Sequence, residues 1–340
     1  MLRRNTTGLR PVAGQRRGTV VAMAGLVAAS VALAGCGGGS SSSATSINKL
    51  EIMAPADPGG GWDQTARSMQ AAIQGADIVS NVQVSNVGGA GGTNGLAKLA
   101  NEKSETYLMI SGLVMVGAVE TNASEKRLED TTPIARLTAE DEVVVVPADS
   151  PYQTVSDLMA AVNEKGKEIA ITGGSAGGTD HVLAGLMLQD KQIAFDKLNY
   201  VPFSGGGESL AALLGGQVKA GISGIGEYKE QILAGKLRAL ATSGPQRNAA
   251  LPDVPTLKQS DMNVELTNWR GVVAPGGISV QAKDKLVSLV TEMHDSPAWK
   301  AELEKKGWND TFLTGHEFQT FLTMEIGRIK PVLQDIGLVP

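Results

Sequence analysis

The sequence is poor in cysteine and histidine, and these shortages exclude several kinds of site. Cys36 is its only cysteine, so no disulfide can form within the chain. The three histidines, His181, His294 and His316, include no pair at metal-ligand spacing. We therefore expect neither a metal site nor a metal cofactor.

Basic residues are also in the minority, which argues against nucleic acid as a partner. The sequence holds 30 Lys and Arg against 35 Asp and Glu. Five of the arginines fall in residues 1–35, which contain no acidic residue, so the rest of the chain has 25 basic and 35 acidic residues and a net charge near −10. A nucleic-acid-binding surface would need a basic excess. An anion can still bind where a site offers local hydrogen-bond donors.

The N-terminal segment lacks an apolar run long enough for a membrane span. Its run, residues 20–34, is shorter than the roughly 20 residues that cross a bilayer. The run follows five arginines and ends in Leu-Ala-Gly-Cys36, a pattern that resembles a lipobox and predicts a signal peptide over 1–35 with lipidation of Cys36. Residues 36–47 then form a Gly/Ser tether. An ordinary signal peptide and a twin-arginine signal at Arg16-Arg17 remain alternatives.

Beyond the tether, strand-like apolar runs alternate with helical patterns. The expected strands are 50–54, 82–85, 107–110, 143–146, 169–172, 198–201, 220–222, 237–241 and 272–274. The expected helices are 63–73, 93–100, 155–163, 179–188, 208–214, 228–234, 280–294, 297–306 and 317–335. This alternation predicts an α/β fold with mainly parallel sheets.

Four glycine-rich loops each join an expected strand to an expected helix. They cover residues 57–63, 88–94, 173–180 and 204–208. Gly60 and Gly89 are 29 positions apart, Gly174 and Gly205 are 31 apart, and the two pairs lie 114 to 116 positions from each other. The matched spacing predicts two similar α/β lobes that each present two loops to a shared cleft.

Such loops can bind an anion without any lysine or arginine. The helix behind each loop leaves its first N–H groups unpaired and carries a positive dipole end, and glycine lets the backbone approach a ligand. Neutral donors of this kind favour a carboxylate over a polyphosphate. The candidate ligand-binding residues are Pro58, Gly59, Gly60, Gly61, Trp62, Asp63, Gly89, Ala90, Gly91, Gly92, Thr93, Asn94, Ser111, Gly112, Ser175, Gly177, Gly178, Thr179, Asp180, Ser204, Gly205, Gly206 and Ser223. Alternatively each loop is only a tight turn, Asp63 and Asp180 are N-caps, and Trp62 is a packing residue.

Enzymatic motifs were tested as alternatives. The dinucleotide-binding pattern fails at Asn94, and no loop ends in Gly-Lys-Ser/Thr. Residues 173–177 do satisfy G-x-S-x-G, so a serine hydrolase is conceivable, with Ser175 as nucleophile, His294 or His316 as base, and Asp253 or Asp261 as acid. No oxyanion segment precedes the motif, and its helix is expected to start only after Thr179. No catalytic residue is therefore assigned.

The glycine loops and several other segments resemble the receptor proteins of tripartite tricarboxylate transporters. The resemblance covers the chain from about residue 49 to its end. It is carried by residues 54–67 (APADPGGGWDQTAR), 86–95 (NVGGAGGTNG), 146–152 (VPADSPY), 174–181 (GSAGGTDH), 251–257 (LPDVPTL) and 269–271 (WRG). One departure is Val87-Gly88, where many members carry Arg-Pro or Lys-Pro.

The resemblance implies a two-lobe, type II periplasmic-binding-protein fold of the Venus-flytrap kind. Lobe one would be 48–148 plus 262–340 and lobe two 149–261, with the carboxylate held by loops 58–63 and 88–94. The first loop is similar to the tricarboxylate branch, so a ligand such as citrate is expected. The protein would be a monomeric extracytoplasmic receptor, anchored by lipid on the periplasmic side or outer face of the membrane, that delivers its ligand to integral-membrane permease subunits. A ligand-sensing subunit of a signalling system is the remaining alternative.

Overall fold

One long strand, β4, connects the two halves of a mixed sheet. The computed structural model describes residues 47–203 and 206–340. The main strand order is β2-β1-β3-β9-β4-β7-β5-β6, and β8 and β10 also pair with β4. The strands are β1 (Leu50–Ala54), β2 (Val82–Asn86), β3 (Tyr107–Gly112), β4 (Thr132–Pro147), β5 (Ala170–Gly173), β6 (Asn199–Pro202), β7 (Ala220–Gly224), β8 (Leu237–Thr242), β9 (Thr267–Ala274) and β10 (Asn309–Thr314).

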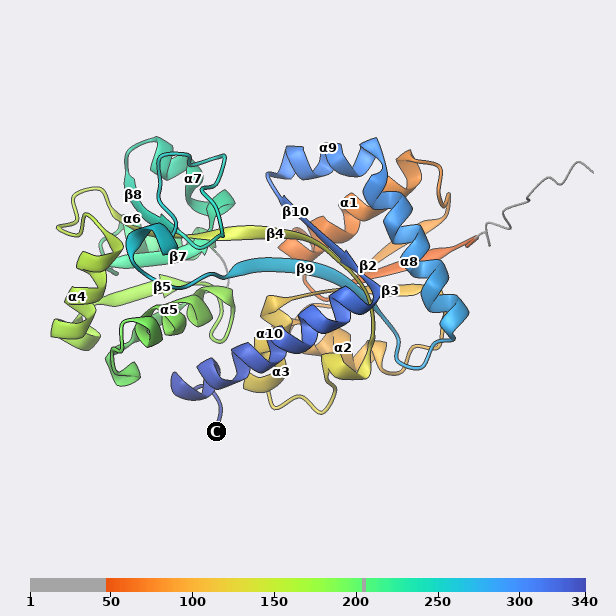
Figure 1. Ribbon diagram of the computed structural model, residues 1–340, viewed down its shortest axis with the longest axis horizontal. Helices are drawn as coiled ribbons and strands as arrows, with labels where there is room; N and C mark the ends of the chain where they lie inside the picture. The colour runs from red at the N-terminus through yellow and green to blue at the C-terminus, as the bar shows by residue number, and fades with distance from the viewer. Residues whose placement is uncertain (1–46, 204–205) are drawn as a thin grey trace, which may run out of the picture. The chain divides into compact units, whose positions relative to one another are not determined.

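The pairing of β4 changes partway along its length and so defines two sheets. Up to Asp141 it pairs with β9, and with β10 it joins β1, β2 and β3 in sheet A. From Glu142 it pairs with β7, and with β8 it joins β5 and β6 in sheet B. Figure 1 shows β4 and β9 running side by side through the middle of the described chain.

Helices cover both faces of each sheet. In sheet A, α1, α8 and α9 pack together, and α3 packs against α2 and α10 (Figure 1). In sheet B, α6 and α7 contact each other, while α5 contacts α10. The helices are α1 (Gly61–Gly75), α2 (Thr93–Leu99), α3 (Leu113–Thr121), α4 (Val155–Lys165), α5 (Thr179–Asp190), α6 (Gly206–Leu214), α7 (Ile225–Leu233), α8 (Val280–Asp295), α9 (Pro297–Lys306) and α10 (Gly315–Asp335).

Local sequence explains where several helices begin. Thr154 caps α4 by accepting a hydrogen bond from the Asp157 N–H at 3.1 Å, and the Asp157 carboxylate accepts from the Thr154 N–H at 2.9 Å. Ser279 and Ser296 cap α8 and α9 in the same way. By contrast, α1 and α5 begin after Gly60 and Gly178, where no side chain caps the helix. The N–H groups of these two helices are therefore open to a ligand.

The expectation of mainly parallel sheets was wrong in detail. Parallel pairing is confined to β1, β2 and β3 and to β5, β6 and β7, whereas β4 pairs antiparallel with β7, β8, β9 and β10. The first part of β4 was missed because its charged residues and Pro133 read as a loop, and polar β10 was missed for a similar reason. The apolar helix α3 shows no one-sided pattern, because it is almost wholly buried.

The remaining predictions on organisation are only partly covered by the structure. Residues 1–46, with the predicted signal peptide and Cys36, lie outside the described residues, as do Ser204 and Gly205. The lobe boundaries at 148/149 and 261/262 stay a prediction. Within the described ranges, no helix combines the length and the apolar character that crossing a membrane requires.

Candidate ligand-binding cleft

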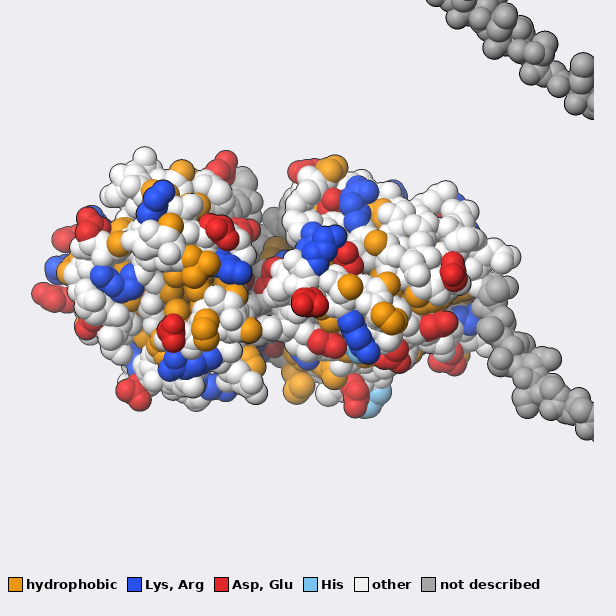
Figure 2. All heavy atoms as spheres, turned by 90° about the horizontal axis from the view of Figure 1, so that it is seen from above, with side chains coloured by type: hydrophobic (Ala, Val, Ile, Leu, Met, Phe, Trp, Pro, Cys, Tyr) orange, Lys and Arg blue, Asp and Glu red, His pale blue; other side chains and the backbone are white. Residues whose placement is uncertain are grey.

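A cleft of about 590 Å³ lies where sheets A and B meet. One side of its lining comes from the loop before α1, from β9 and from the end of α9; the other comes from the loop before α5 and from the β7–α7 junction. β4 contributes Glu140 and Glu142, which flank the change of pairing. In the space-filling view a furrow separates the two halves on the face shown (Figure 2). The volume falls within the roughly 300–1,000 Å³ typical of small-molecule sites.

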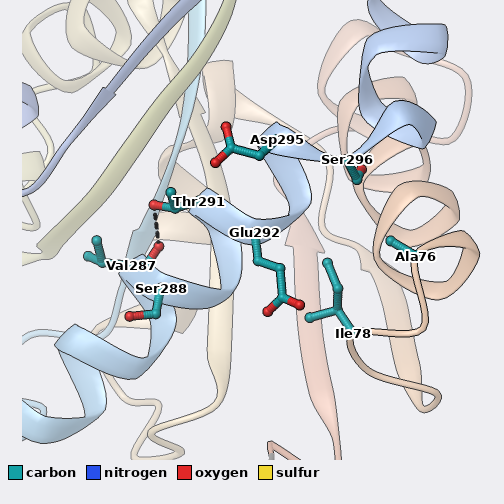
Figure 3. A pocket seen from close by; sticks show the side chains of 8 residues that line it. All are labelled: Ala76, Ile78, Val287, Ser288, Thr291, Glu292, Asp295 and Ser296. Atoms are coloured by element: carbon teal, nitrogen blue, oxygen red, sulfur yellow. Dashed lines mark hydrogen bonds between the residues drawn. The ribbon is translucent and has the colours of Figure 1, made fainter. Parts of the chain in front are cut away.

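A second hollow, of about 640 Å³, lies beside α8 and is a poorer candidate for an anion. Figure 3 shows its lining, with Ala76 and Ile78 on one side and Val287 and Ser288 of α8 on the other. The charged residues that line it are Glu292 and Asp295, both acidic. Since like charges repel, this hollow does not suit a carboxylate. The cleft between the sheets is therefore the candidate site.

The first glycine loop presents the open N-terminus of α1 to the cleft. Gly59, Gly60, Gly61 and Trp62 all line it. Gly59 has φ of 90°, a left-handed conformation that a residue with a Cβ adopts only at a cost. No side chain caps α1, so its first N–H groups and its dipole can act on a bound anion.

Asp63 stabilises this loop through hydrogen bonds and does not point into the cleft. Its carboxylate accepts hydrogen bonds from the Gly59 N–H at 2.8 Å, from Asn86 Nδ2 at 2.8 Å and from Arg67 Nε at 3.0 Å. Burial acts to raise the pKa of Asp63, but these bonds outweigh it and hold that pKa below its ordinary value. With its oxygens occupied, Asp63 fixes the loop and does not line the cleft.

The second glycine loop lies directly behind the first. A Cβ built on Gly92 would come within 2.6 Å of the Trp62 ring and 2.7 Å of the Met115 methyl group. A Cβ built on Gly112 would also lie close to this ring, 3.0 Å from Trp62 Nε1. Thr93 Oγ1 and Asn94 Nδ2 donate to backbone oxygens of their own loop, at 2.9 and 3.1 Å. Loop 88–94 thus supports the Trp62 wall, and none of its residues lines the cleft.

Arg270, on β9, brings a positive charge to the start of α1. Its side chain lines the cleft, and a Cβ built on Gly61 would lie 2.9 Å from Arg270 Nη2. Arg270 is only 7% exposed, forms an ion pair with Glu140 and lies over the Trp308 ring at 5.2 Å. Trp308 Nε1 also donates to Glu140 at 2.8 Å. This network holds the guanidinium where it and the α1 N-terminus can meet the same carboxylate.

On the sheet B side, the third glycine loop is organised by Asp180. Gly174, Ser175, Gly178, Thr179 and Asp180 all line the cleft. The Asp180 carboxylate accepts from the Gly174 N–H, and burial raises the pKa of Asp180 to about 7. The Thr179 hydroxyl is 2% exposed and has no hydrogen-bond partner among the described residues. Behind the loop, neutral His181 stacks on Tyr200 at 4.0 Å, because burial lowers the pKa of His181 to about 4.

Glu142 is the most strongly perturbed acid in the cleft. It is fully buried, and its carboxyl group lies against that of Asp180, with which it shares a side-chain hydrogen bond. Its charged neighbours are also acids: Asp180 on α5, Glu140 on β4 and Glu227 on α7. Burial, followed by repulsion from these neighbours, raises the pKa of Glu142 well above its ordinary value. Burial and the neighbouring acids therefore favour the protonated form of Glu142.

This shift predicts that Glu142→Gln stabilises the protein more as the pH rises. A folded-state pKa above the unfolded one means that the folded chain binds more protons. The free energy of unfolding therefore falls above the ordinary pKa of 4.5, toward the raised pKa. The fall is about 1.4 kcal/mol per pH unit for each retained proton, and we expect a gain on the order of 2 kcal/mol for the variant at pH 7. Urea unfolding at pH 4.5, 6 and 7.5 measures the free energy of unfolding of both proteins, and the exposed Glu292→Gln variant is the control. A gain in stability that did not depend on pH would contradict a raised pKa for Glu142.

The hydrolase alternative finds no support in the geometry around Ser175. This serine is exposed, and three residues separate it from the first residue of α5 at Thr179. His294 is held between Asp295 and Asp310, at 3.0 Å from each, and stacks on Phe312. Among the described residues no hydrogen bond joins Ser175 Oγ to a histidine. Within the same residues no group of three His, Cys, Asp or Glu side chains could hold a metal ion.

The cleft thus gathers part of the predicted site and adds residues that the predictions did not include. Predicted residues in the lining are Gly59, Gly60, Gly61, Trp62, Ser175, Gly178, Thr179, Asp180 and Ser223. Predicted residues outside it are Pro58, Asp63, Gly89, Ala90, Gly91, Gly92, Thr93, Asn94, Ser111, Gly112 and Gly177. For Gly206, at the start of α6, the structure gives no placement relative to the cleft. Residues not predicted include Glu140, Glu142, Glu227, Arg270, Lys306 and Trp308. Arg270 stands in the WRG segment of the family resemblance, which was the one available signal for it.

Comparison with known proteins places the chain in a family. The sequence model TctC, described as "Tripartite tricarboxylate transporter family receptor", matches residues 66–338. A UPF0065 protein of Agrobacterium vitis is 31% identical over 252 residues, covering 72% of this chain and 71% of that protein.

Solved structures share the fold. MatC of Rhodopseudomonas palustris with bound malate is similar with a TM-score of 0.69 at 22% identity, covering 84% of this chain and 99% of that one. An R. palustris protein with adipate gives a TM-score of 0.73 at 21% identity, covering 86% and 99%. The two-lobe, type II binding-protein architecture is therefore confirmed. With an uncapped helix N-terminus and a buried arginine at the meeting point of its two sheets, the chain belongs to the receptors of the tripartite tricarboxylate transporter family.

Proposed function

We propose that this protein is an extracytoplasmic receptor that binds a small carboxylate in the cleft and delivers it to the permease subunits of a tripartite transporter. The observation that carries the proposal is the convergence of the open α1 N-terminus and the Arg270 guanidinium on one point of the cleft. Two similar structures hold the dicarboxylates malate and adipate, which supports the ligand class. Ligand binding across two lobes shifts such a protein toward a closed form, which the permease would recognise.

Two finer predictions belong to this proposal. The sequence of loop 57–63 favours a tricarboxylate such as citrate as the ligand. The pattern ending at Cys36 favours a lipid anchor, which a Cys36→Ser variant would test by its release from the membrane fraction. A monomer is expected, because a single chain contributes both walls of the cleft.

A thermal-shift panel tests carboxylate binding. A ligand that binds only the folded state raises Tm by mass action, about 2.7 kcal/mol of stabilisation at 100 times Kd. The panel holds succinate, malate, adipate, citrate, isocitrate, terephthalate, aspartate and glutamate. We expect a concentration-dependent rise in Tm with at least one of them.

Gly60 offers a matched pair of variants for this panel. Its backbone is extended, with φ of −66°, a conformation that other residues adopt. A Cβ built there would lie 3.3 Å from the Asp57 carbonyl oxygen, so a substitution needs a small local shift. In Gly60→Asp the new carboxylate caps α1 and takes the N–H groups that the ligand needs, so we expect binding to fall at least about tenfold. Gly60→Ala leaves those N–H groups open and should keep the response. Equal responses from both variants, or none from the unaltered protein, would contradict the proposal.

A further inference from the structure

We infer that Lys306, the last residue of α9, is a specificity-determining residue that binds a second carboxylate of the ligand on the same side of the cleft as the first. The inference rests on the proposed carboxylate binding and deepens it, because it assigns a residue and a position to the second acid group. Three features carry it: the balance of charge on the sheet A wall, the hydrogen bonds that hold Lys306 in place, and an unpartnered amide beside it on the same wall.

Lys306 supplies the unbalanced positive charge of the sheet A wall. The charged residues that line this wall are Glu140, Arg270 and Lys306. Glu140 forms an ion pair with Arg270 and also accepts a hydrogen bond from Trp308 Nε1 at 2.8 Å. Lys306, by contrast, forms no ion pair among the described residues. The pair of Glu140 and Arg270 is neutral as a whole, so one positive charge remains for a ligand to balance.

The acid of α9 whose charge Lys306 influences is already bonded to other groups. Glu302 accepts from Ser68 Oγ at 2.6 Å and from Lys305 Nζ at 3.0 Å. The bond from Ser68 is the largest cause of the lowered pKa of Glu302, and the charge of Lys306 adds to it without a direct contact. Glu302 therefore does not take up the ammonium group of Lys306.

Hydrogen bonds tie Lys306 to the first glycine loop. Its Nζ donates to Gln64 Oε1 at 3.1 Å, and Gln64 Nε2 donates to the Gly59 carbonyl at 3.0 Å. The Trp308 ring carries both cations of the wall, with Arg270 Cζ 5.2 Å and Lys306 Nζ 6.0 Å from its centroid. An ammonium group offers three donors, so two donors of Lys306 remain for a ligand that is bound at this loop.

Asn268 provides a neutral donor on the same wall. It stands two positions before Arg270 on β9, so both side chains lie on one face of the strand, and both line the cleft. In the pairing of β9 with β4, Asn268 is opposite Glu140. Its side-chain amide has no hydrogen bond among the described residues, which leaves two N–H donors for a ligand.

A ligand with a single carboxylate would leave Lys306 without an anionic partner. The first carboxylate occupies the start of α1 and the Arg270 guanidinium, as proposed above. A second carboxylate on the same side would gain a charge-assisted hydrogen bond from Lys306, whereas a neutral group in its place would gain only an ordinary one. Since specificity is a difference of affinities, Lys306 favours di- and tricarboxylates over monocarboxylates of the same shape.

Diacids and their monoamides test the inference on the purified protein by titration calorimetry at pH 8. The pairs are succinate with succinamate, malate with malamate, adipate with adipamate and terephthalate with terephthalamate. Within each pair only the charge of the second acid group differs. We expect the diacid of at least one pair to bind about tenfold or more tightly than its monoamide. Equal affinities within every pair would overturn this inference alone, whereas absence of binding to every carboxylate would overturn the proposed function with it.

Three variants assign the preference to Lys306. Lys306→Met should weaken the tightest di- or tricarboxylate, citrate and isocitrate included, about tenfold and leave monoamides within about twofold. Lys306→Arg keeps the charge and should stay within about threefold of the unaltered protein. Lys305→Met is the matched control, because it removes the same charge from the same helical turn, and its side chain is 69% exposed and does not line the cleft. Equal effects of Lys305→Met and Lys306→Met would show that Lys306 is only a helix-terminal charge and would overturn the assignment.

Discussion

Replacing Arg270 with glutamine is expected to weaken carboxylate binding by about 100-fold or more, or roughly 2.7 kcal/mol. The guanidinium lies against Gly61 at the start of α1 and is held there by Glu140 and Trp308. A charge-assisted bond in a partly desolvated site is about twice as strong as a neutral one. Glutamine keeps a donor but is two bonds shorter, loses the charge and leaves Glu140 without its ion pair. Titration with the best carboxylate of the panel measures the loss.

Arg238→Gln is the control for this experiment. Arg238 on β8 donates to the carbonyl oxygens of Ala148, Ser150 and Tyr152, and it does not line the cleft. Its replacement should lower Tm without changing ligand affinity. Unchanged affinity in Arg270→Gln would show that Arg270 only braces Glu140, and would leave the N-terminus of α1 as the anion site by itself.

Truncating Trp62 to alanine is expected to cost about 3–5 kcal/mol of folding free energy and to abolish ligand binding. The ring is 8% exposed and fills the space between the two loops of sheet A, in contact range of Gly92, Gly112 and Met115. Its loss would leave a cavity under the first loop, which would then no longer hold its N–H groups in place. The fall in Tm should be roughly 6–20 °C, given about 2–4 °C per kcal/mol for large domains.

The Trp299→Ala variant separates the loss of folding free energy from the loss of ligand binding. Trp299 on α9 is fully buried but does not line the cleft, so its removal should lower Tm by a similar amount while the ligand still raises it. If the ligand still raised the Tm of the Trp62→Ala variant, the packing of Trp62 between the two loops would not be needed for binding. A Trp62→Phe variant, which refills most of the volume, should recover part of both losses.

Local sequence determined the helices and the glycine loops of this protein. The alternation of apolar runs and helical periods located most elements of both sheets, because those elements are stabilised by contacts near in sequence and by period-matched burial. The glycine clusters at 57–63 and 173–180 lie in two loops that line the cleft, and glycine favours the left-handed backbone found there. The cleft-lining Gly59, with its positive φ, is one such position.

Only the tertiary structure decided which donors and acids face the ligand. Glu140 and Glu142 read as part of a charged connection, but both line the cleft, because β4 passes between two sheets and its side chains alternate. Arg270 and Thr179 belong to elements 91 positions apart in the sequence, and the strand order alone places them at one site. Loop 88–94 has the composition of a ligand loop, but the structure places Gly92 against the Trp62 ring and none of the loop's residues in the lining of the cleft. The sequence by itself thus determined the α/β class and the glycine-rich start of α1, whereas long-range packing decided the strand order and the charge of the opposite wall.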